Sequence, residues 1–130
     1  MESKHPHLDL VGASSERALE LVSQLYASSE KGSHNASMRS LPLLMEHTNV
    51  VKLIWARAIE VASTPTFSKI ERYKSQANEA LIGAGDRHKE LSHNHLPGDE
   101  LDAFMMEFAT LIECYCKLLD EPYTVQSANK

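Results

Sequence analysis

The sequence contains little of what disulfide-rich, fibrous or membrane-spanning proteins require. Its 130 residues include two cysteines, five glycines and five prolines, and neither glycine nor proline recurs periodically. Collagen-like and low-complexity classes are therefore excluded. The most apolar stretch, residues 41–62, is interrupted by the ionisable side chains of Glu46, His47, Lys52, Arg57 and Glu60. A membrane-spanning helix needs about 20 almost uncharged residues, so we expect no contact with a membrane.

The residues around the N-terminus lack the apolar core that a secretion signal contains. The only two cysteines are Cys114 and Cys116. On a helix their side chains would point about 200° apart, so they could not form a disulfide with each other. Unpaired thiols without a secretion signal are typical of a reducing compartment, and we therefore expect a cytoplasmic protein.

Motifs that carry catalysis or bind cofactors are also absent from the sequence. It has no Gly-x-Ser-x-Gly nucleophile elbow and no His-Glu-x-x-His zinc motif. Residues 83–85, Gly-Ala-Gly, lack both the preceding strand and the following Lys-Ser/Thr of a phosphate-binding loop. The Cys-x-Cys spacing at 114–116 differs from the Cys-x-x-Cys of zinc and redox sites. We expect no catalytic residue, no cofactor and no enzymatic activity.

What the sequence does contain is helical periodicity, and no segment alternates in the manner of a strand. Four segments carry it, at residues 14–29, 40–63, 66–95 and 98–121. The short links at 64–66 and 96–98 make the last three segments antiparallel neighbours. The sequence thus predicts an all-α, single-domain antiparallel bundle of about four helices, three long and the first shorter. The bundle would span residues 14–121, between a flexible N-terminal segment at 1–13 and a flexible tail at 122–130.

The boundaries of these helices are predicted from residues that start or stop a helix. The second helix should begin near Ser40 and end before Pro65, and the fourth should end before Pro122. Residues 30–40 would form a polar loop that covers the overhanging end of the third and longest helix. The third segment keeps its apolar phase through residues 83–85, although each helical glycine costs about 1 kcal/mol, so we expect it to be continuous.

The charge of the chain is concentrated in one segment. The whole chain carries 13 basic and 18 acidic residues, a formal charge of −5, which argues against a general nucleic-acid-binding protein. Residues 99–121 contain seven acidic residues and one lysine, which gives this segment a net charge of −6. These carboxylates either provide solubility and offset the helix dipole, or form an acidic face that recruits a basic partner. The candidates for that face are Asp99, Glu100, Asp102, Glu107 and Glu113.

The second helical segment has more apolar surface than one neighbouring helix can cover. It holds the only tryptophan, Trp55, with Arg57 close by. Tryptophan and arginine are over-represented at the energetic centres of protein interfaces. Two interpretations remain. Trp55 fills the junction between the first helix and the others, or it joins Met45, Arg57 and Ile59 in a surface for a partner.

Three of the seven histidines, His88, His93 and His95, cluster near the end of the third segment. Helical geometry places His88 and His95 on the apolar stripe and His93 on a polar face, so we expect no metal site.

We predict a non-enzymatic regulatory protein that binds another protein, one with a basic surface or a second copy of this chain, without direct nucleic-acid binding. Two alternatives remain open. One is a metal-binding bundle that uses these histidines, and the other is an acidic inhibitor that mimics nucleic acid.

Overall fold

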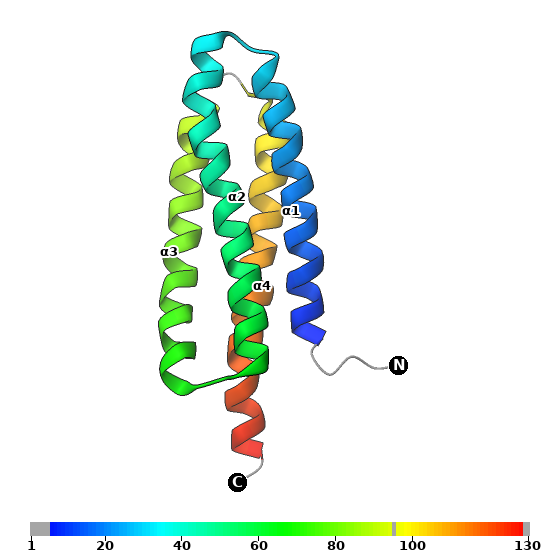
Figure 1. Cartoon of the computed structure of the whole chain (residues 1–130), viewed down its shortest axis with the longest axis vertical. Helices are drawn as coiled ribbons and strands as arrows, with labels where there is room; N and C mark the ends of the chain where they lie inside the picture. Colours follow the sequence, from blue (N-terminus) through cyan, green and yellow to red (C-terminus); the bar gives the residue numbers. More distant parts are fainter. Residues whose placement is uncertain (1–5, 95, 129–130) are drawn as a thin grey trace.

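The structure, a computed structural model, describes residues 6–94 and 96–128, with side chains as far as residue 121. The described residues form four helices, α1 (Pro6–Glu30), α2 (His34–Ser63), α3 (Phe67–Ser92) and α4 (Gly98–Ala128), and no strand. Consecutive helices run antiparallel and are joined by short links (Figure 1). The prediction of an all-α antiparallel bundle of about four helices is confirmed.

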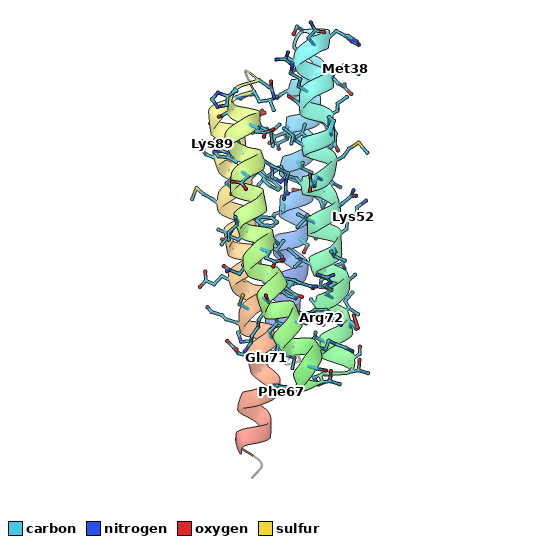
Figure 2. All side chains as sticks on the ribbon, turned by 90° about the vertical axis from the view of Figure 1, so that its left-hand side faces the viewer. Met38, Lys52, Phe67, Glu71, Arg72 and Lys89 are labelled. Carbon is cyan, nitrogen blue, oxygen red and sulfur yellow. The ribbon has the colours of Figure 1, made fainter. Side chains whose placement is uncertain are left out.

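The four described helices form a bundle in which α2 and α4 contact each other across the centre, whereas α1 and α3 do not. α1 packs most extensively against α4 and then against α2, while α3 packs against α4 and, less extensively, against α2. α2 and α4 therefore lie diagonally across the bundle, and Figure 1 shows α2 in front of α4 with α1 and α3 on either side. Figure 2 shows the same pair at opposite edges of the bundle. As a result, the outward sides of α2 and α4 face opposite directions.

The apolar stripes of the helices meet in one core. α4 supplies its largest fully buried side chains, Phe104, Phe108 and Tyr115. On α3 the predicted apolar phase is preserved in four residues spaced seven apart, and all of them are buried: Ile70, Ala77, Ala84 and Leu91. Burying one large apolar side chain stabilises a fold by about 1.5–3 kcal/mol, so the shared stripe accounts for the association of the helices.

Helix α1 begins at Pro6 and not near Ser14, so residues 6–13 are helical, contrary to the prediction of a flexible segment. Proline suits the first helical position because the N–H it lacks would have no partner there. The added turns also bury Val11, which is 0% exposed. Ser14, at which the predicted first segment begins, is instead a buried residue in the middle of the helix.

Helix α2 begins at His34, so the loop predicted at residues 30–40 shrinks to a three-residue link. The N-cap is Ser33, whose Oγ accepts a hydrogen bond from the backbone N–H of Ala36 at 3.2 Å. Pro42 lies inside the helix. With these extra turns α2 has 30 residues and α3 has 26, so the prediction that α3 is the longest helix and overhangs α2 is wrong.

Helix α4 continues through Pro122 to Ala128, so the prediction that the helix stops before Pro122 is wrong. An interior proline costs a helix about 3 kcal/mol, but it removes only one backbone hydrogen bond and does not have to end the helix.

Helix α3 is continuous through residues 83–85, as predicted. It ends at Ser92, however, and His93 is its C-cap, so the prediction that it runs to residue 95 is wrong. No described helix meets the length and apolarity that crossing a membrane would require.

Candidate functional site

The outward side of α2 carries exposed apolar side chains. Met38 is 59% exposed and Met45 is 56% exposed. A shallow groove of about 460 Å³ lies beside them, lined by Met38, Leu41, Pro42, Met45, Glu46 and Asn49. We call the four apolar residues of this lining, Met38, Leu41, Pro42 and Met45, the outer α2 surface. Contiguous exposed apolar groups are typical of interaction sites.

The other predicted residues of α2 point elsewhere. Trp55 is half-buried and lies against α1, where a Cβ atom added to Gly12 would come within 3.0 Å of its Cη2 atom. This contact fits the interpretation in which Trp55 fills the junction with the first helix. Arg57 turns toward α3, and its guanidinium carbon lies 5.0 Å from the centroid of the Tyr73 ring. Ile59 is 43% exposed, four turns along the helix from Met45.

Two of the predicted acidic residues of α4 face α1. Glu107 has only 16% of its side chain exposed, and its Oε1 lies 2.8 Å from Nε of Arg17. Glu100 accepts a hydrogen bond of 2.6 Å from the hydroxyl of Ser28. Both carboxylates therefore attach α4 to α1 and are not available as an acidic face.

The other three predicted acidic residues lie on the exposed side of α4. Asp102 has 73% of its side chain exposed and lies 3.4 Å from Nε2 of His88. Glu113 has 67% exposed and pairs with Lys117 on the same helix at 3.3 Å. Asp99 is also exposed. The helical period distinguishes the two sets, because Glu100 and Glu107 are seven residues apart and share one face of the helix.

A buried polar pair between α2 and α3 was not predicted. Nε of Arg87 donates a hydrogen bond of 3.1 Å to Nδ1 of His47, and the two residues are 9% and 1% exposed. The His47 ring centroid lies 4.4 Å from that of Phe104. Burial, together with the charges of Arg87 and His88, lowers the pKa of His47 to about 3. His47 is therefore neutral at physiological pH, and its Nδ1 can accept the bond.

The position of this pair follows from the direction of helical side chains. Antiparallel alignment through the 64–66 link places His47 level with about residue 82 of α3. Side chains on a helix lean toward its N-terminus, so the long side chain of Arg87 reaches back about one turn. Gly83 leaves room for it, since a Cβ added there would lie 3.3 Å from Nη1 of Arg87. At the protein surface Oε1 of Glu46 lies 3.5 Å from the same nitrogen.

The described residues, which omit His95, contain no group of three or more His, Cys, Asp or Glu side chains that could hold a metal ion. Cys114 and Cys116 are not paired with each other, as the helical spacing predicted, and both are half-buried.

Comparisons with protein-family models, with curated proteins and with solved structures found no match for this chain. Its function is therefore inferred from the arrangement of its own residues.

Proposed function

We propose that this protein is a non-enzymatic helical binding protein whose outer α2 surface associates with a second copy of the chain. The observation that carries the proposal is the exposure of Met38 and Met45 on a side of α2 that no other described helix covers. Burial of apolar surface contributes about 25 cal/mol per Å². Two such helices packed together would remove these side chains from water in both copies at once.

The charged residues beside this surface favour a two-fold arrangement. In a two-fold dimer the α2 helices run antiparallel, and the same patch of each copy contacts itself. An axis near Pro42 places Met38 beside Met45 of the second copy. Arg39 and Glu46 are also seven residues apart, on one edge of the helix. The same axis brings Arg39 beside Glu46 of the second copy, so two reciprocal ion pairs would flank the apolar contact.

The exposed carboxylates of α4 belong to a separate proposed contact. The outward sides of α2 and α4 face opposite directions, so one partner helix cannot contact both. We infer that Asp99, Asp102 and Glu113 orient a basic partner protein on the far side of the dimer. Imitation of nucleic acid is less well supported, because Glu100 and Glu107 face α1. Metal binding has no support among the described residues.

Sedimentation equilibrium of the wild-type chain and two glutamate variants tests self-association. Met45→Glu places a charge in the apolar contact and should weaken the dimer at least tenfold, since an unpaired buried charge costs several kcal/mol. Met106→Glu is the matched control, because Met106 is 73% exposed but lies on α4. It should leave the mass unchanged. Circular dichroism checks that both variants stay helical. Trp55 is unsuitable for this test because it also packs on Gly12.

A charge exchange tests the two-fold arrangement itself. Arg39→Glu and Glu46→Arg should each weaken the dimer by placing like charges together, and the double variant should restore it. A wild-type chain that stays monomeric at high concentration would overturn the proposal. Equal weakening by Met45→Glu and Met106→Glu would show that the contact does not involve α2.

A further inference from the structure

A second hollow lies on the seam between α2 and α3. In Figure 2 this seam runs between α3, in front, and α2, on the right. The hollow is a groove of about 330 Å³ with apolar walls, which include Val50 and Ile54 of α2 and Ala77 and Ala80 of α3. It shares no lining residue with the groove beside the outer α2 surface. We call it the α2–α3 groove.

Polar contacts fix the two helices at both ends of the groove. Toward the 64–66 link, the hydroxyl of Tyr73 donates a hydrogen bond of 2.7 Å to Oε2 of Glu60, and Nζ of Lys69 lies 3.2 Å from Oε1 of the same residue. Toward the other end lies the bond from Arg87 to His47. These contacts set the positions of α2 and α3, so the groove between them is bounded by specific hydrogen bonds at either end.

The floor of the groove holds a hydroxyl group without a partner. Tyr115 of α4 lines the groove and is 1% exposed. Among the described residues its hydroxyl has no hydrogen-bond partner, and neither has the buried Oε1 of Gln76 at the groove wall. A buried tyrosine hydroxyl normally finds a partner, and leaving one unsatisfied costs about 1–3 kcal/mol. Burial raises the pKa of Tyr115, so the hydroxyl keeps its proton and can donate it to an acceptor.

The rim of the groove holds a cation without a carboxylate. Arg57 is half-buried, and its guanidinium group stacks on the Tyr73 ring. None of the ion pairs among the described side chains includes Arg57. Stacking leaves the N–H groups at the edge of the guanidinium plane able to bind an anion in a two-point contact. The one acidic lining residue, Glu79, lies farther along the groove on α3.

These observations together specify the chemistry of an occupant. We propose that the α2–α3 groove binds a small apolar carboxylic acid, whose carboxylate contacts Arg57 and the Tyr115 hydroxyl. Its hydrocarbon part lies against the walls formed by Val50, Ile54, Ala77 and Ala80. Glu79 repels a second negative charge, so the site selects a monoanion with its carboxylate at the Arg57 end. This site is independent of self-association through the outer α2 surface.

Isothermal titration calorimetry with octanoate tests the proposal, with octanamide as the uncharged analogue of the same length. Octanoate should bind at least tenfold more tightly, because hydrogen bonds to a charged group are the stronger ones. Arg57→Gln should remove this preference and leave octanamide binding unchanged. Arg72→Gln is the matched control, since Arg72 stacks on the same Tyr73 ring at 5.3 Å but does not line the groove. It should bind octanoate like the wild type.

Tyr115→Phe tests the floor of the groove with almost no change of shape. It should raise the thermal midpoint of the ligand-free protein, because the unsatisfied hydroxyl is gone, and weaken octanoate binding severalfold. Three results would overturn the proposal. These are binding of octanoate no tighter than that of octanamide, equal weakening of octanoate binding by Arg57→Gln and Arg72→Gln, and stabilisation of the ligand-free protein by Tyr115→Phe with no change in octanoate binding. The last result would mean that the hydroxyl is unsatisfied but does not contact the carboxylate of the ligand.

Discussion

Mild acidification should destabilise the protein chiefly through one residue, His47. Its pKa is about 3 in the folded state, against an ordinary value of 6.5. Because the folded pKa is the lower one, only the unfolded chain takes up this proton between those two pH values. The contribution of His47 to the free energy of unfolding is therefore fully present above about pH 6.5 and is lost as the pH falls toward about 3. At about pH 5 the loss is about 2 kcal/mol relative to about pH 7.5.

Urea denaturation of the wild type and of His47→Gln at these two pH values measures the effect. Glutamine does not titrate, and its Oε1 can accept the hydrogen bond from Arg87. The other titrating groups near the pair, Glu46, Asp86, His88 and Asp102, are common to both proteins and largely cancel. The wild type should lose about 2 kcal/mol more than the variant on acidification. Equal losses in the two proteins, or an NMR titration that gives His47 its ordinary pKa, would refute the reasoning.

Two pairs of substitutions test the helix contacts by urea denaturation. Gly85→Ala should raise the free energy of unfolding by about 1 kcal/mol, the gain in helix propensity, since no described atom lies within 4 Å of the added Cβ. Gly12→Ala should instead destabilise the protein by about 1 kcal/mol or more, because the Cβ meets Trp55. Glu107→Gln should lower the free energy of unfolding more than Glu113→Gln does, because Glu107 is half-buried and pairs with Arg17 of α1, whereas Glu113 pairs with an exposed lysine of its own helix. Equal effects within either pair would contradict these contacts.

The interior of each helix could be predicted from the sequence, whereas several of the ends could not. The buried repeat Ile70, Ala77, Ala84 and Leu91 follows from the period of the helix alone, so it needs no knowledge of the neighbouring helices. A helix end depends on which small polar residue caps it. Ser14 and Ser33 are the same residue type, and each precedes a periodic apolar segment in the sequence, but only Ser33 caps a helix. What distinguishes them is whether the preceding turn buries an apolar side chain, as Val11 does.

The contacts that define the candidate sites depend on how far a side chain reaches from one helix to the next. The helical period predicts which face a side chain lies on, but not this reach. The helical period could have separated the acidic residues of α4 that face α1 from those that are exposed, because Glu107 lies beside the apolar stripe and Glu113 lies opposite it. Tyr115 could not have been assigned in this way. In the sequence it is one more large residue of the α4 core stripe, and its ring does pack there. The position of its hydroxyl beneath the α2–α3 groove is set by the polar contacts that hold those two helices. A core tyrosine thus becomes part of a binding site through the spacing of two helices to which it does not belong.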